Sequence, residues 1–220
     1  MNRSEARSIF YRTLSGCYGP PQGGRTRWMV AGGWIKLLQE SFGLLIEGGG
    51  GALPHWEALV LEEKEGMACE MMRDHRRICV GLFPRALAPP CDGVSFDGRW
   101  LQEAPSQTIA PEGVFCCDRQ NGYVPQAGLR SVPDYIVSGF EFMEILTDRA
   151  ARLAGAEKIR LEEVQMHFFS RFLLPWVPPF CKRIAEVAHL PFYRCLGELT
   201  GRFVEFEKNY LGVTEEGDAG

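Results

Sequence analysis

The stretch PFYRCLGELTGRFVEFEKNY, residues 191–210, places large apolar side chains at intervals of four and three residues. This is the spacing of one face of an α-helix, so the sequence predicts a long amphipathic helix here. Pro191 suits the first turn of that helix, where its missing N–H removes no hydrogen bond. The apolar face consists of Phe192, Leu196, Leu199, Phe203, Phe206 and Tyr210.

Helical spacing also governs most of the remaining chain, and no stretch alternates long enough to predict a strand. We therefore expect an all-α fold, a helical bundle formed as a single domain by residues 1–220. Prolines at 175, 178 and 179 separate two of its helices, and Gly32 with Gly33 weakens another. Besides the final helix, the sequence predicts helices within residues 6–14, 28–46, 55–80, 136–147, 164–172 and 177–188.

Residues 83–128 interrupt this pattern with six prolines and five glycines, which exclude a long helix. We interpret this segment as a long connection. Because a long loop within a compact domain is often functional, it is a candidate for part of a binding surface. The tail, 213–220, is expected to fray.

Composition excludes several classes of protein. The chain has 220 residues, 45% of them hydrophobic, and a net charge of −4 with scattered basic residues. These values indicate a globular protein and argue against nucleic acid as a partner. No stretch resembles a secretory signal or a membrane span, so we expect a cytoplasmic protein whose eight cysteines are free thiols.

Motifs of catalysis or cofactor binding are absent from the sequence. The pair Cys116 and Cys117 has no C-x-x-C partner, and the four histidines form neither HxxxH nor HExxH. The glycines at 48–51 are not followed by the Lys-Ser/Thr of a phosphate loop, and there is no G-x-S-x-G. We therefore expect no enzyme, no metal and no cofactor.

The stretch SVPDYIVSGFEFMEIL, residues 131–146, begins a helix with acidic groups. Ser131 and Asp134 have the spacing of a capping box, so Asp134 has a purely structural interpretation. Alternatively, Asp134 and Glu141 lie on one stripe of the helix that can receive guanidinium groups. A small-molecule-binding protein or enzyme with an acidic pocket around these two carboxylates is a further alternative, and for Glu144 we prefer a solvated face.

The stretch FFSRFLLPWVPPF, residues 168–180, gathers large apolar side chains around a corner made by prolines. Core packing between two helices is the preferred interpretation. If the stretch were exposed, it would form a groove for a peptide helix.

Taken together, these stretches resemble the TorD/DmsD/NarJ family of maturation chaperones for molybdenum-dependent redox enzymes. Three similar segments are ARSIFYRTLSGCYGPP (6–21), DHRRICVGLFPRALAPPCDGVSFDGR (74–99) and VPDYIVSGFEFMEIL (132–146). The most specific is FFSRFLLPWVPPFCKRIAEVAHLPFYRCLGELT (168–200). The resemblance implies an all-helical bundle without catalysis. It also implies binding of the twin-arginine signal peptide, or of the apo catalytic subunit, of such an enzyme.

The family motifs carry over onto particular positions. Pro133 and Asp134 match the Pro-Asp-His motif, with Tyr135 in place of the usual histidine. Pro89, Pro90 and Val94 match a second motif linked to the peptide pocket, with Cys91 in place of an aromatic residue. The resemblance thus implies peptide-binding positions at Pro89, Pro90, Cys91, Val94, Pro133, Asp134 and Tyr135, and the acidic stripe adds Glu141 to the expected set. We expect a monomer, or a homodimer formed by exchange of helices.

Overall fold

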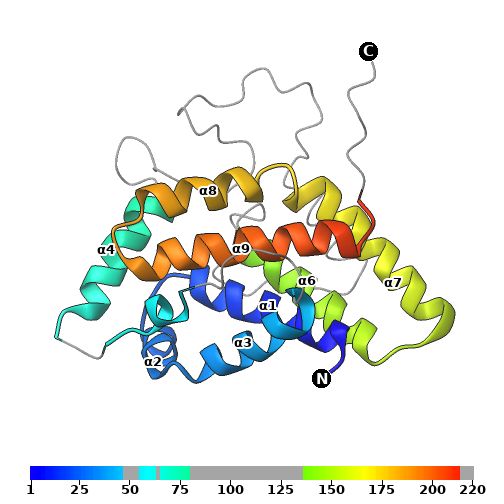
Figure 1. Ribbon diagram of the computed structural model, residues 1–220, viewed down its shortest axis with the longest axis horizontal. Helices are drawn as coiled ribbons and strands as arrows, with labels where there is room; N and C mark the ends of the chain where they lie inside the picture. Colours follow the sequence, from blue (N-terminus) through cyan, green and yellow to red (C-terminus); the bar gives the residue numbers. More distant parts are fainter. Residues whose placement is uncertain (47–54, 63–64, 80–135, 214–220) are drawn as a thin grey trace, which may run out of the picture.

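A computed structural model describes residues 1–46, 55–62, 65–79 and 136–213, and in these ranges the chain contains helices and no strand (Figure 1). The predicted all-α fold is therefore confirmed. The first half comprises α1 (Arg3–Tyr18), α2 (Gly24–Ala31), α3 (Gly33–Ile46), the 3-10 turn η1 (Trp56–Leu59) and α4 (Met67–Cys79). The second half comprises α6 (Ile136–Ala151), α7 (Gly155–Phe168), the π-helical turn η2 (Phe169–Leu173), α8 (Val177–Val187) and α9 (Pro191–Tyr210).

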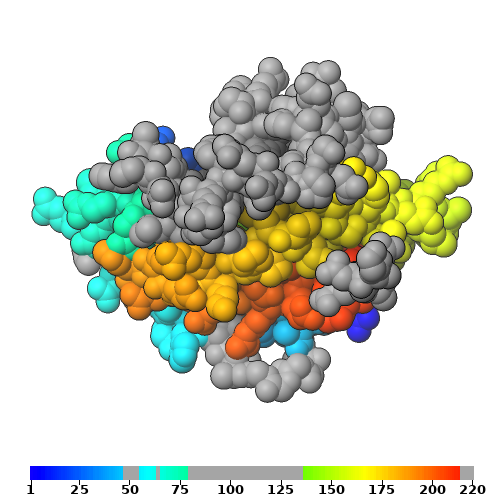
Figure 2. Space-filling model, turned by 90° about the horizontal axis from the view of Figure 1, so that it is seen from above, coloured from blue at the N-terminus to red at the C-terminus, as the bar shows by residue number. Residues whose placement is uncertain are grey.

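Helix α1 lies at the centre of the bundle, because it packs along both α6 and α3 and also contacts α9. Helix α8 lies along α9. Figure 2 shows α4 and α7 at opposite ends of the elongated molecule. One continuous core joins these helices, and in it Phe10 of α1 stacks on Phe203 of α9 with ring centroids 4.3 Å apart.

A buried ion pair ties the first helix to the last. Arg7 donates from Nε to one carboxylate oxygen of Glu207 at 2.6 Å and from Nη2 to the other at 2.7 Å. Tyr11 donates its hydroxyl to the same carboxylate at 2.9 Å, and the guanidinium lies over the ring of Tyr210. Both charged side chains are fully buried, so the pair fixes how α1 lies against α9.

A second group of polar contacts, besides the Arg7–Glu207 pair, joins α4 to the turn between α8 and α9. Asp74 is buried, and its carboxylate accepts the backbone N–H groups of His189 and Leu190 at 3.1 and 2.9 Å. Leu190 is the N-cap residue of α9, so Asp74 satisfies amides at the start of that helix. Arg77 pairs with Asp74 and donates to the carbonyl of Val187 at 2.7 Å, which closes the junction.

Two predicted helices are each divided in the structure. The expected helix over 28–46 is divided into α2 and α3 at Gly32, which adopts a left-handed conformation with a φ of 66°. The expected helix over 55–80 is a 3-10 turn followed by α4, and Gly66, with a φ of 86°, lies immediately before α4. By contrast, α1 is longer than the predicted 6–14, because Asn2 and Glu5 form a capping box at its start.

Candidate functional site

The described part of the predicted peptide site is the beginning of α6. Glu141 belongs to it, whereas Pro89, Pro90, Cys91, Val94, Pro133, Asp134 and Tyr135 lie outside the described residues. The expected connection 83–128 and the capping box of Ser131 and Asp134 also lie outside them. The predictions that concern these positions stay predictions.

The first turns of α6 are set into the core. The residues from Ile136 to Phe140 are all buried. At Gly139 an added Cβ would lie 2.8 Å from Leu173 Cδ2, so α6 packs closely against the π-helical turn η2. Glu141, which follows this buried segment, is half-buried. The head of α6 is therefore held in position by packing, with a carboxylate at the edge of the packed region.

Ser138 lies on the stripe of α6 that the sequence assigns to the site. Its side chain is 2% exposed, and among the described residues its hydroxyl has no hydrogen-bond partner. Ser138 thus adds a buried polar group to the same face as Glu141.

The sequence had suggested that Glu144 lies on a solvated face, and this expectation is wrong. Arg12 of α1 donates from Nε to Glu144 Oε1 at 2.7 Å, and the glutamate side chain is 22% exposed. The sequence did indicate that the acidic stripe can receive guanidinium groups, and here the guanidinium belongs to the chain itself. Glu144 therefore has a structural role between α1 and α6.

The corner at residues 168–180 is core, as the preferred interpretation predicted. Trp176 is buried and donates its indole N–H to the carbonyl of Phe172 at 2.7 Å. Phe168 packs edge-on against Phe142 of α6 with ring centroids 4.5 Å apart. The buried members are Phe168, Phe169, Phe172, Leu173, Trp176, Val177 and Phe180. Because these side chains are buried, the corner supports α6 and does not offer an open groove.

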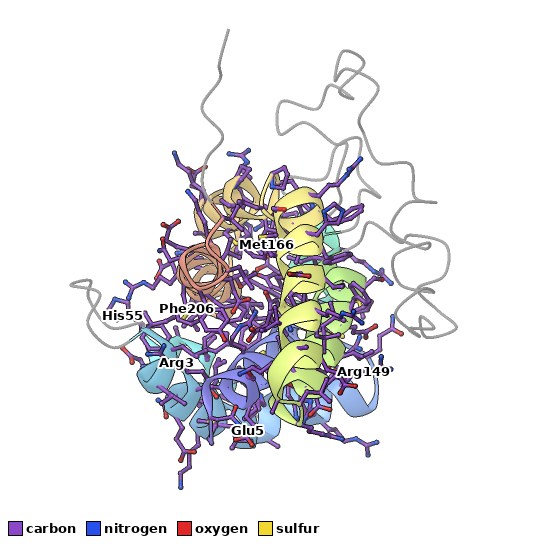
Figure 3. The ribbon with its side chains drawn as sticks, turned by 90° about the vertical axis from the view of Figure 1, so that its right-hand side faces the viewer. Arg3, Glu5, His55, Arg149, Met166 and Phe206 are labelled. Atoms are coloured by element: carbon purple, nitrogen blue, oxygen red, sulfur yellow. The ribbon has the colours of Figure 1, made fainter. Side chains whose placement is uncertain are left out.

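A hollow with both apolar and acidic lining residues occurs at the exposed side of α7, where the sequence had indicated no site. No residue from 155 to 164 is buried, and Ile159 and Met166 are 57% and 39% exposed. Together with Glu162 and Glu163 of α7, and with Tyr210 and Leu211 at the end of α9, they line a hollow of about 430 Å³. Figure 3 faces this end of the molecule, with α7 in the foreground and α9 beside it. In the sequence, only the spacing of seven residues between Ile159 and Met166 indicated that these two apolar side chains share one face of a helix.

Titratable groups in the core do not form a reactive centre among the described residues. Burial raises the pKa of the Cys17, Cys181 and Cys195 thiols, so these cysteines stay protonated, and they are free as predicted. Burial lowers the pKa of His75, whose Nε2 lies 2.9 Å from the carbonyl oxygen of Tyr18. The parts of the chain that the structure describes contain no cluster of side chains suited to a metal ion.

Comparison with known proteins decides the family. The profile of the nitrate reductase delta subunit family matches residues 50–182, which is 133 of the 220 residues. The chain belongs to this family. Members of the nitrate reductase delta subunit family are maturation chaperones of molybdenum-dependent enzymes, so the resemblance identified from the sequence is confirmed. The matched range includes α4, α6, α7 and every residue of the expected peptide-binding set.

No curated protein matches the chain. Within the described ranges, no helix combines the length and the apolar character needed to cross a bilayer.

Proposed function

We propose that the protein is a cytoplasmic, system-specific chaperone of a molybdenum-dependent oxidoreductase. It binds the twin-arginine signal peptide, the apo catalytic subunit, or both, and holds the subunit back from export until its cofactor is inserted and assembly is complete. The protein acts by reversible binding and not by catalysis. The match of residues 50–182 to the nitrate reductase delta subunit family carries this proposal.

The chemistry of the client peptide supports the choice of residues. A twin-arginine peptide presents two guanidinium groups next to an apolar segment, and guanidinium groups form charge-assisted, bidentate hydrogen bonds with carboxylates. Asp134 and Glu141 are seven residues apart, the spacing from which the sequence predicts one acidic stripe along a helix. A half-buried carboxylate such as Glu141 attracts a cation more strongly than a fully exposed one, because water screens it less.

The remaining members of the set supply apolar and shape-determining contacts. Pro89, Pro90, Cys91 and Val94 are small or apolar and suit the apolar segment of a signal peptide, whereas Pro133 and Tyr135 flank the acidic group. Glu144 is engaged by Arg12, so we assign it no part in binding. The chaperone works as a monomer or as a homodimer formed by helix exchange, which sedimentation of the pure protein distinguishes.

The first experiment is a pull-down of the tagged protein from its own cells grown anaerobically, with identification of the retained proteins by mass spectrometry. We expect recovery of a molybdoenzyme catalytic subunit. If no such subunit is recovered from cells that express one, the proposed client class is wrong.

A second experiment measures the affinity of the protein for the N-terminal peptide of that subunit by calorimetry. Asp134→Asn should weaken binding at least tenfold, because a charge-assisted hydrogen bond contributes about 1.5–3 kcal/mol. Asp148→Asn is the matched control, since Asp148 lies on α6 but pairs with Arg152 at the surface. Equal affinities for Asp134→Asn and wild type would remove Asp134 from the site.

A further inference from the structure

A second hollow on the molecule lies away from α6, between α2 and the start of α4. Its volume is about 540 Å³, within the range of about 300–1,000 Å³ that is typical of small-molecule sites. Both helices lie at the left end of the bundle in Figure 1. The described lining residues are Thr26, Arg27, Val30, Ala31, Leu61, Met67 and Ala68.

One side of this pocket suits an anionic group. Arg27 is the one charged side chain among the described lining residues, and no described carboxylate pairs with it. Next to it, the hydroxyl of Thr26 is buried and has no hydrogen-bond partner among the described residues. An arginine and an unused hydroxyl together supply donors for a carboxylate.

The first turn of α4 adds to this preference. Met67 and Ala68 are the first two residues of the 13-residue helix, and both line the pocket. The amides of a first turn have no partner within their helix, and the helix dipole favours negative charge at that end. Donors for an anionic group therefore come from both helices that form the pocket, and Glu70 is the one acidic residue in the first turn of α4.

The rest of the wall is apolar. Val30 and Ala31 contribute from α2, and Leu61 and Met67, which are both buried, from the segment that leads into α4. An inorganic anion would leave this surface unused. A ligand with an acidic head and an apolar body would cover it, and burial of apolar surface contributes about 25 cal/mol per Å².

We propose that the pocket between α2 and α4 binds a carboxylate attached to an apolar body, with Arg27 and Thr26 as the partners of the carboxylate. Such a group is supplied either by a small fatty or aromatic acid or by the C-terminus of a peptide that ends in an apolar residue. The proposal does not rest on the chaperone function, because it uses neither Asp134 nor Glu141.

Calorimetric titration of the full chain with four probes tests the chemistry. Octanoate should bind at least tenfold more tightly than octan-1-ol, which lacks the charge, and than acetate, which lacks the apolar body. Octylamine, which carries the opposite charge, should not bind measurably. Equal binding of octanoate and octan-1-ol, or of octanoate and acetate, would overturn the proposal.

Three variants test the location. Arg27→Gln should reduce octanoate affinity at least tenfold and leave octan-1-ol affinity unchanged. Ala68→Phe, at an exposed position of α4, should weaken both ligands by filling the pocket. Arg160→Gln, at an exposed arginine of α7, is the matched control and should behave as wild type. If Arg160→Gln reduces octanoate affinity as much as Arg27→Gln, general charge attraction explains binding and the site is wrong.

A pair of peptides distinguishes the two sources of the carboxylate. An N-acetylated tetrapeptide ending in Leu-Leu is titrated with its C-terminus free and with its C-terminus amidated. Binding of the free-acid peptide, lost on amidation and in Arg27→Gln, supports a chain terminus as the ligand. Octanoate binding without peptide binding supports a small acid. If neither octanoate nor the peptide binds, the proposal is overturned, whether or not the chaperone retains its client.

Discussion

Arg7 and Glu207 show what a single residue contributes to this fold. Burial alone would lower the pKa of Arg7, but the charge of Glu207 and its hydrogen bonds outweigh this effect, so the pKa is raised and the guanidinium stays charged. Replacing Glu207 with glutamine would leave that cation buried without a counter-ion. We expect Glu207→Gln to lower the free energy of unfolding by about 3–5 kcal/mol in urea denaturation, as for other broken buried pairs.

Two controls separate the ion pair from the helix that carries it. Glu205→Gln, at an exposed position of the same helix, should change stability by no more than about 0.5 kcal/mol. The triple variant Arg7→Met, Tyr11→Phe and Glu207→Leu should recover most of the loss, because apolar side chains can replace a buried pair and Tyr11→Phe removes the hydroxyl that Glu207 accepts. A triple variant as unstable as Glu207→Gln would show that packing, and not the unpaired charge, causes the effect.

His75 gives stability a dependence on pH. Burial lowers its pKa, the hydrogen bond with the Tyr18 carbonyl opposes this, and the charges of Arg25 and Arg76 lower the pKa further. The unfolded chain therefore binds a proton at a higher pH, near the ordinary value of about 6.5, than the folded protein does. Stability should be complete above pH ~6.5 and fall as the pH decreases below it, by at most about 1.4 kcal/mol per pH unit.

Urea denaturation between neutral pH and pH ~5 measures this slope. In His75→Gln the contribution should disappear, whereas replacement of the exposed His167 should leave it in place. An unchanged slope in His75→Gln would assign the pH dependence to other groups.

At the scale of elements, two glycines of α9 offer a matched comparison. A Cβ at Gly197 would clash with Ile184 Cγ2 of α8 and lie 2.9 Å from the carbonyl oxygen of Cys181. At Gly201 the nearest atom is Cys181 Cβ at 3.7 Å, an ordinary contact. Gly197→Ala should destabilise the protein by about 1–3 kcal/mol through overpacking, whereas Gly201→Ala should be neutral or stabilise it by up to about 1 kcal/mol. Thermal unfolding of both variants tests the close approach of α8 and α9, and equal effects would contradict it.

Element boundaries could be predicted from sequence where local chemistry determines them. Helices α8 and α9 have prolines in their first turns and carry a strong apolar period, so Val177–Val187 and Pro191–Tyr210 agree with expectation. The division of 28–46 and 55–80 depended on left-handed glycines, Gly32 and Gly66, and a glycine within a helical period does not reveal whether the helix breaks there.

The candidate sites also differ in how far the sequence could predict them. Ser138 and Glu141 could be assigned to one site because a single helix positions both, whereas the pocket between α2 and α4 joins Arg27 to Met67 across 40 residues of sequence. Likewise, Arg7 and Glu207 are 200 residues apart. Pairings of this kind follow from how helices pack, which periodicity does not specify.

At the scale of the whole molecule, the two ends of the described chain share one core. The stacked rings of Phe10 and Phe203, and the edge-on contact of Tyr11 with Phe203, join α1 to α9. Helix α6 is linked to the same cluster because Phe140 packs against Tyr11 and Tyr18. Because this core depends on both ends of the sequence, we expect it to assemble as a unit, and the single domain stays a prediction.

We therefore predict that the protein unfolds in one cooperative transition. Far-UV circular dichroism reports all helices, whereas tryptophan fluorescence reports local surroundings, including those of the stacked pair Trp28 and Trp34 and of Trp176 in the corner before α8. In urea the two signals should give the same midpoint, and Glu207→Gln should shift both equally although Glu207 lies near the end of α9. If the variant moved one signal and left the other in place, part of the bundle would unfold independently of the core shared by α1 and α9, and the chain would contain more than one folding unit.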